Sequence, residues 1–351
     1  MESRSDLYGI SIFWRKRFTL APQAIGNRFT RKGRSLRNAG SHLGLFAVFV
    51  SSLIVALNCN SAPINKPSSL DSPKQATTSA AKGSDPVMVG AGDIASCDDL
   101  SGAEATAKLI DNIPGTVFAV GDLAYPDGSD EQFAKCYGPT WGRFKERTRP
   151  APGNHEYRQG GASGYARYFG APAGEASRAY YSYDLGAWHI IVLNSECAAV
   201  GGCEATSPQG QWLHKDLAQH PVNCTLAYFH IPLFSSGAKH GNDAEMKPLW
   251  QALYAGGADI VINGHDHDYE RFGPQDPEGH LDNTRGIREF VAGTGGKNSH
   301  RIFAQPVANS EVRNADTFGV LKLTLHANSY DWEFIPVAGK TFRDSGSGAC
   351  H

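Results

Sequence analysis

The residue types best suited to chemistry gather in five short segments, most of which begin with a glycine. In chain order these are GDIA (92–95), GDLAY (121–125), GNHE (153–156), His230 and GHDH (264–267). Together they offer carboxylates, an amide, imidazoles and a phenol, which are the donors that a pair of divalent or trivalent ions needs. Each segment alone is more typical of a turn or a polar loop. All five in one chain predict a metal site with two ions.

These segments come where a predicted strand ends. Apolar runs such as PVMVGA (86–91) and IVIN (260–263) stop just before them and predict buried strands. Helical patterns are expected between them, at 102–111, 208–219 and 245–255. Alternating patterns predict hairpins, at 179–194 and 318–337. The mixture predicts an α/β fold with parallel and antiparallel strands, whose strand ends place the ligands.

The order of the segments, D…GDxxY…GNH[DE]…H…GHxH, resembles that of the calcineurin-like metallophosphoesterases. GHDHDYER (264–271) is especially similar to the purple acid phosphatases within that superfamily. The resemblance covers residues 87–300, nearly all of the expected folded part. It implies a mixed α/β fold, namely a two-layer β-sandwich of mixed sheets flanked by helices, with a dinuclear metal site at the strand ends.

The resemblance also implies seven metal ligands. One ion would be held by Asp93, Asp122, Tyr125 and His267. The other would be held by Asp122, Asn154, His230 and His265, so that Asp122 bridges the pair. Residues two apart in an extended segment point to the same side, which would let His265 and His267 each reach one ion. Asp266, between them, is expected to point away from the ions.

The identity of the metal depends on Tyr125. Many relatives use a histidine two residues after the first aspartate, but that position is Ala95, which cannot ligate. A phenol with a pKa of about 10 binds as phenolate only to a strong Lewis acid. The expected cofactors are therefore two metal ions, Fe(III) with a divalent partner (Zn, Fe or Mn).

The activity implied by the resemblance is hydrolysis of a phosphate monoester by a metal-bound hydroxide, as in an acid phosphatase. His155 and His240 are the candidate catalytic residues, as groups near the phosphate and the leaving oxygen. Glu156 is expected to orient ligands or to lie on the surface, and Arg271 to form a structural ion pair. His214 and His220, on a predicted helix, are expected to be surface residues. The alternatives are a phosphodiesterase or nucleotidase with the same metals, or a surface binding protein with a relict site.

Charge is distributed unevenly along the chain. Residues 1–42 contain nine Lys/Arg and two acidic residues (net +7), whereas residues 43–351 contain 24 and 33 (net −9). An acidic body disfavours nucleic acid as a partner, because basic groups supply affinity for phosphate backbones. The expected partner is a small phosphate ester, and no oligomeric state is indicated.

The first 85 residues suggest export. Residues 43–59 are predicted to be a signal-peptide core or a membrane anchor, since the uncharged stretch 43–57 is shorter than the roughly 20 residues of a spanning helix. Residues 60–85 are rich in Ser, Ala, Pro and Thr and predict a flexible linker before a metallophosphoesterase domain at 86–351. The expected location is secreted, periplasmic or on the cell surface, with the membrane contacted only through such an anchor.

Six cysteines follow residue 85, an even number that favours disulfides in an exported protein. Cys197 and Cys203 are the simplest pair, since they close a short loop. The remaining pairs would then be Cys97–Cys136 and Cys224–Cys350, although six cysteines allow 15 pairings. A cysteine zinc site is disfavoured because the sequence has no CxxC motif.

Overall fold

A computed structural model describes residues 84–299 and 305–351. The predictions for residues 1–42 and 43–59 lie outside the described residues, as does nearly all of the linker predicted at 60–85. Among the described residues, no helix is both long enough and apolar enough to cross a membrane.

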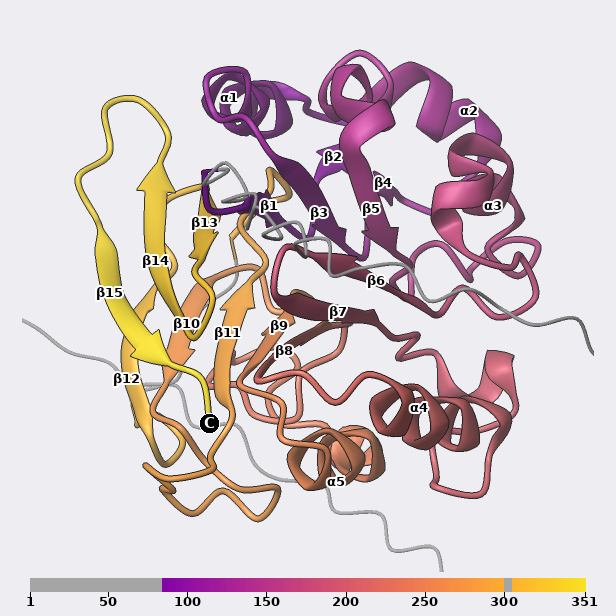
Figure 1. Cartoon of the computed structure of the whole chain (residues 1–351). Coiled ribbons are helices and arrows are strands. Elements are labelled where there is room, and N and C mark those ends of the chain that lie inside the picture. The colour runs from indigo at the N-terminus through magenta and orange to yellow at the C-terminus, as the bar shows by residue number, and fades with distance from the viewer. Residues whose placement is uncertain (1–83, 300–304) are drawn as a thin grey trace, which may run out of the picture. The chain divides into compact units, whose positions relative to one another are not determined.

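Two mixed sheets form the centre of the fold (Figure 1). The six-stranded sheet has the order β15-β14-β13-β1-β3-β5, with β1, β3 and β5 parallel and the other neighbours antiparallel. Its strands are β1 (Val87–Ala91), β3 (Thr116–Val120), β5 (Thr148–Ala151), β13 (Gly319–Leu325), β14 (Ser329–Pro336) and β15 (Asp344–Ala349).

The seven-stranded sheet has the order β12-β10-β11-β9-β8-β7-β6. Strands β7, β8, β9 and β11 are parallel, and the others pair antiparallel. The strands are β6 (Tyr181–Leu185), β7 (Trp188–Val192), β8 (Cys224–Tyr228), β9 (Ile260–Asn263), β10 (Tyr269–Phe272), β11 (Arg288–Ala292) and β12 (Ser310–Asn314). A separate parallel pair joins β2 (Ala95–Ser96) to β4 (Ala124–Tyr125).

The sheets face each other across one apolar core. Alternate residues of β1 and β3, such as Met88 and Phe118, belong to the same buried cluster as Ile190 of β7 and Ile262 of β9. Residues that point the other way, such as Val89, form a second buried cluster. The predicted two-layer sandwich of mixed sheets is therefore confirmed.

Helices cover both outer faces. On the six-stranded sheet lie α1 (Ser101–Ile110), α2 (Asp130–Gln132), the π-helix Phe133–Tyr137 and α3 (Ser163–Phe169) (Figure 1). On the seven-stranded sheet lie α4 (Pro208–Gln219) and α5 (Lys247–Ala255). The 3₁₀ helices are Trp141–Arg147, Ala171–Ala173, Cys197–Val200 and Ala244–Met246. The three predicted helices are thus α1, α4 and α5, and the two predicted hairpins are β6–β7 and β13–β14.

The three disulfides follow the expected pairing, which leaves no thiols for a cysteine zinc site among the described residues. They are Cys97–Cys136, Cys197–Cys203 and Cys224–Cys350. The last joins the start of β8 to the residue that follows β15. Arg271 also ties the sheets together, because its Nε lies 2.7 Å from Asp344 Oδ2, and this is the structural ion pair that the sequence predicts.

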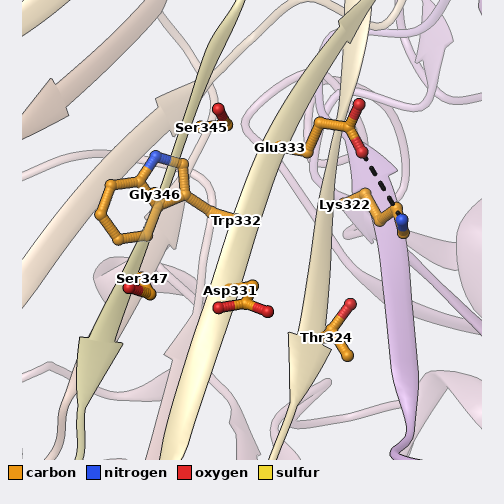
Figure 2. Close-up of a pocket in the computed structure, with 8 residues that line it drawn as sticks. All are labelled: Lys322, Thr324, Asp331, Trp332, Glu333, Ser345, Gly346 and Ser347. Carbon is orange, nitrogen blue, oxygen red and sulfur yellow. Dashed lines mark ion pairs between the residues drawn. The ribbon is translucent and has the colours of Figure 1, made fainter.

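Strand β15 was not predicted, and its sequence, DSGSGA, explains why. Glycines weaken strands because they have no side chain to pack. Here Gly346 lies against the indole of Trp332, so that a Cβ would come within 2.3 Å of the ring (Figure 2). The surface around it is a hollow of about 440 Å³ over β13–β15 whose polar lining includes the ion pair Lys322–Glu333 (3.5 Å).

Candidate metal centre

The seven predicted ligands lie at or after strand ends: six come after strands of the two large sheets, and Tyr125 ends β4 of the separate pair. Asp93 follows β1, Asp122 follows β3, and His265 follows β9. All three have left-handed backbones, with φ of 59°, 54° and 72°. Non-glycine residues rarely adopt this conformation, and such strain persists where surrounding structure enforces it, often at functional sites.

One group of donor atoms surrounds the phenol of Tyr125. Its oxygen lies 2.7 Å from Asp93 Oδ1 and 3.2 Å from His267 Nε2. His267 Nε2 is also 3.2 Å from Asp93 Oδ1. The other nitrogen, Nδ1, donates to the Asn298 carbonyl at 2.6 Å, which leaves Nε2 as the ligand nitrogen.

A second group surrounds His230, which is fully buried. Its Nδ1 donates to the Val120 carbonyl at 2.9 Å, so Nε2 is the nitrogen that faces the other members of the group. That Nε2 lies 3.2 Å from Asp122 Oδ2 and 3.3 Å from His265 Nδ1. One ligand atom from each of these three residues lies within 4.8 Å of the other two. Asp122 Oδ2 is also 3.1 Å from the Tyr125 oxygen, and Asp122 therefore joins the two groups.

His265 and His267 contact different groups, but not by the geometry expected from the sequence. The prediction of an extended segment is wrong, because residues 265–268 form a bend that His265 enters with positive φ. Asp266 points away from both groups, as predicted. Its carboxylate accepts hydrogen bonds from Ser235 Oγ (2.7 Å) and Gly241 N (3.0 Å).

The charges in the centre perturb one another strongly. Burial opposes the charged form of His230, but Asp122 and Asp93 outweigh it and raise the pKa of His230 to about 10. Burial and the neighbouring His230 lower the pKa of His265 to about 3. Burial, with Asp122 and Asp93, raises the pKa of Tyr125 well above its usual value. Two buried carboxylates thus attract positive charge to this position, and a proton on His230 supplies part of it.

The residues fit a pair of hard metal ions. The Oδ1 atom of Asn154 is buried and has no hydrogen-bond partner among the described residues, although buried amide oxygens normally have one. Glycines keep the space open: a Cβ on Gly121 would come within 2.4 Å of the His230 ring, and one on Gly153 within 2.3 Å of Asp122 Oδ1. Because a carbonyl oxygen and carboxylates are ligands for such ions, the unpartnered Asn154 oxygen supports metal binding here.

Glu156 supports the centre from a buried position beneath Asp122. Its Oε2 accepts from the backbone N–H of Asp122 (2.9 Å) and of Gly153 (2.8 Å), and Oε1 accepts from that of Leu123 (2.9 Å). Burial, together with the charge of Asp122, raises the pKa of Glu156 to about 8. The sequence predicts that Glu156 either orients ligands or lies on the surface. In the structure it is buried and orients the backbone of a predicted ligand. The GNHE motif identifies Glu156 in the sequence, but it does not predict which backbone N–H groups this side chain binds.

The two candidate catalytic histidines lie at the mouth of the centre. The ring of His155 lies 4.3 Å from that of Tyr125, and its Nδ1 donates to the Pro126 carbonyl at 2.6 Å. The remaining nitrogen, Nε2, is 3.7 Å from Asp122 Oδ2, and burial lowers the pKa of the ring. His240 is exposed, and its ring lies 3.9 Å from that of His265.

Comparison with known proteins agrees with this geometry. The family model of the calcineurin-like phosphoesterases matches residues 89–269, just over half of the 351 residues. The chain belongs to the calcineurin-like phosphoesterase family. The matched range contains all seven predicted ligands and both candidate catalytic histidines.

Within the family, the chain resembles the purple acid phosphatases. It is 30% identical over 204 residues to purple acid phosphatase 15 of Arabidopsis thaliana, covering 48% of this chain and 38% of that protein. It is 29% identical over 184 residues to human acid phosphatase type 7, covering 45% and 41%. The structure of purple acid phosphatase PPD1 from yellow lupin has the same fold, with a TM-score of 0.62 and 20% identity over 76% of this chain and 54% of that one. The chain thus spans less than half the length of these two curated relatives.

Proposed function

We propose that the protein is a dinuclear metal-dependent phosphohydrolase that acts on phosphate monoesters in the manner of an acid phosphatase. The observation that carries this proposal is the Asp122–His230–His265 group, whose ligand atoms lie within 4.8 Å of one another. The buried Oδ1 of Asn154, which has no hydrogen-bond partner among the described residues, comes from the loop whose His155 N–H donates to Asp122. The family relationship and the names of the relatives support the same activity.

The residues divide into two ligand sets that share Asp122. We assign Asp93, Tyr125 and His267 to one ion, and Asn154, His230 and His265 to the other. When bound, two metal ions supply a water of lowered pKa and bind phosphate oxygens. The hydrogen bonds that Nδ1 of His230 and of His267 donate to the Val120 and Asn298 carbonyls would keep the two rings oriented toward the ions.

We propose Fe(III) for the ion next to Tyr125, with Zn, Fe or Mn as the divalent partner. The phenol has a raised pKa where two carboxylates face it, so only a strongly charged ion can hold it as phenolate. The disulfides support an oxidising compartment, in which Fe(III) is maintained, and hence an exported protein.

We assign His240 the role of proton donor to the leaving oxygen, and His155 a role in binding phosphate. His240 is the more exposed of the two and lies next to His265, which gives it access to the departing group. A general acid matters most when the leaving group is a poor one. His240→Gln is therefore expected to slow hydrolysis of an alkyl phosphate on the order of 10²-fold and that of p-nitrophenyl phosphate much less. Equal losses for both substrates would contradict this role; His214→Gln, at an exposed position of α4, is the matched control.

The experiment that tests the function is hydrolysis of a chromogenic monoester and a chromogenic diester by metal-replete protein from pH 4 to 9. Faster turnover of the monoester is expected. Preference for the diester would indicate the alternative, a phosphodiesterase or nucleotidase with the same metals. If neither substrate is hydrolysed, both enzyme functions are wrong and a binding protein with a relict site is the remaining alternative.

A further inference from the structure

A second group of His and Asp side chains lies where the β6–β7 hairpin packs on α4. We call it the β7–α4 cluster; it consists of Asp184, His189, Asp216 and His220. His189 Nδ1 lies 2.8 Å from Asp184 Oδ1, and its Nε2 lies 2.8 Å from Asp216 Oδ2. The His220 ring stacks on that of His189, with centroids 4.1 Å apart. His220, predicted to be a surface residue, is partly exposed and also packs on a buried histidine.

We propose that Asp184, His189 and His220 bind a divalent transition metal, with Zn²⁺ as the best fit, and that Asp216 positions His189. One ligand atom from each of the three lies within 4.8 Å of the other two, as in the strand-end centre. Imidazole and carboxylate are both ligands of Zn²⁺, and water is a common additional one.

Hydrogen bonds fix which nitrogen each histidine offers. His220 Nδ1 lies 2.8 Å from the Asp216 carbonyl oxygen, which can only accept, so Nδ1 carries the proton and Nε2 the lone pair. His189 Nε2 donates to the Asp216 carboxylate, which leaves Nδ1 facing Asp184. A carboxylate behind a ligating histidine is the arrangement that commonly orients histidine on zinc.

Two side chains of the cluster are buried and two lie at the surface. The side chains of His189 and Asp216 are only 1% and 8% exposed, whereas those of Asp184 and His220 are 63% and 35% exposed. Zinc bonds of about 2.0–2.1 Å place tetrahedral ligand atoms roughly 3.4 Å apart. Imidazole lone pairs lie in the ring plane, so two stacked rings cannot both point at one ion. Binding would therefore turn the His220 ring out of its stack on His189, which its position at the surface permits, and the exposed Asp184 side chain would follow.

Charge also favours a cation at this position. Two carboxylates flank one imidazole, and Ser182 Oγ donates to Asp216 Oδ1 at 2.8 Å, which keeps that carboxylate in place. Burial opposes a charged His189, yet its hydrogen bonds to the Asp216 and Asp184 carboxylates still raise its pKa. A metal ion would replace the proton that now lies between His189 and Asp184.

The β7–α4 cluster is separate from the strand-end centre. His189 pairs with Thr225 near the start of β8, and His230 comes five residues later, after that strand ends. At about 3.3 Å per residue, the two sites lie roughly 16 Å apart along the sheet. A bound ion would join β6, the edge strand of the seven-stranded sheet, to the end of α4. We therefore assign it a structural role.

The test measures how many metal ions are bound per chain. Full-length protein is equilibrated with Zn²⁺, and ions per chain are measured by elemental analysis for wild type, His220→Ala and His214→Ala. His214 lies on the same helix and is exposed, which makes it the matched control. We expect His220→Ala to hold one ion fewer than wild type at a Zn²⁺ concentration that saturates wild type, and to bind that ion about tenfold or more weakly. His214→Ala should match wild type.

Asp184→Asn gives a second variant at an exposed position, and circular dichroism checks that each variant is folded. Co²⁺ adds a spectroscopic readout, because the visible absorption assigned to this site should disappear in His220→Ala and Asp184→Asn while phosphatase activity is unchanged. The proposal is wrong if His220→Ala and Asp184→Asn both bind as many ions as wild type, or if His214→Ala loses the same ion. Neither result depends on whether the strand-end centre is catalytic.

Discussion

The strand-end centre and the β7–α4 cluster use the same residue types in different ways. In the strand-end centre, three residues with left-handed backbones hold donor atoms around buried carboxylates, and glycines leave space among them. In the β7–α4 cluster, His189 and Asp216 come from the regular strand β7 and helix α4. Backbone strain costs free energy and is typical of functional sites, whereas an unstrained cluster near an edge strand suits stabilisation.

The two sites also differ in access. The candidate catalytic histidines lie at the mouth of the strand-end centre, and an amide oxygen in it lacks a hydrogen-bond partner among the described residues. In the β7–α4 cluster, His189 and His220 are both hydrogen-bonded to Asp216, and the proposed ligand Asp184 is exposed. We therefore expect substitutions in the first site to affect hydrolysis and those in the second to affect only metal content and stability.

The largest effect is expected for Asp122→Asn, which removes the carboxylate shared by both ligand sets. Metal ions contribute several kcal/mol to phosphoryl transfer, so hydrolysis of p-nitrophenyl phosphate should fall about 10³-fold or more. Zinc bound at the β7–α4 cluster should be unaffected. Loss of both would mean that the two sites are not independent.

Glu156→Gln should have an intermediate effect. It keeps the shape of the side chain but weakens the bonds that fix the backbone of Asp122 and Leu123. Supporting groups of this kind typically contribute 10–100-fold to metal affinity or activity, and a loss of about that size is expected. The readout is activity against added metal: excess metal should restore part of the rate, which a globally misfolded variant would not show.

Tyr125→Phe tests the iron assignment. Hydrolysis is expected to fall about tenfold, because one of several ligands is lost. The more specific result is the loss of a visible tyrosinate-to-Fe(III) absorption band that wild type should show. A colourless wild-type protein that is fully active with only Zn or Mn would contradict the assignment.

The smallest effect is expected for Ser182→Ala in the β7–α4 cluster. It removes one hydrogen bond to Asp216, worth about 1 kcal/mol of unfolding free energy. Denaturant unfolding should detect this loss, whereas hydrolysis should be unchanged. A large drop in activity would show that the cluster communicates with the strand-end centre.

Much of the strand-end centre could be predicted from the sequence because its residues come in short motifs after apolar strands. The fold followed from the same periodic patterns, as the β6–β7 and β13–β14 hairpins show. The bend at His265 could not be predicted, since a positive φ at a non-glycine residue depends on tertiary contacts such as the hydrogen bond from its N–H to Asp93.

Other features depend on long-range packing that no local pattern records. Strand β15 consists of small residues that form a strand because Trp332 and Tyr330 lie over its glycines. The β7–α4 cluster joins residues 184, 189, 216 and 220, whose spacing matches no metal motif. Only the packing of α4 on β7 brings these residues together.

Metal add-back to chelator-stripped protein tests the proposed function most directly. In His220→Ala, which removes the β7–α4 ligand, bound ions per chain and monoester hydrolysis are measured together during titration. We predict no hydrolysis without metal and maximal hydrolysis at two ions per chain. Hydrolysis by the stripped protein at the full rate, or a maximum at one ion, would contradict a dinuclear metal-dependent phosphohydrolase.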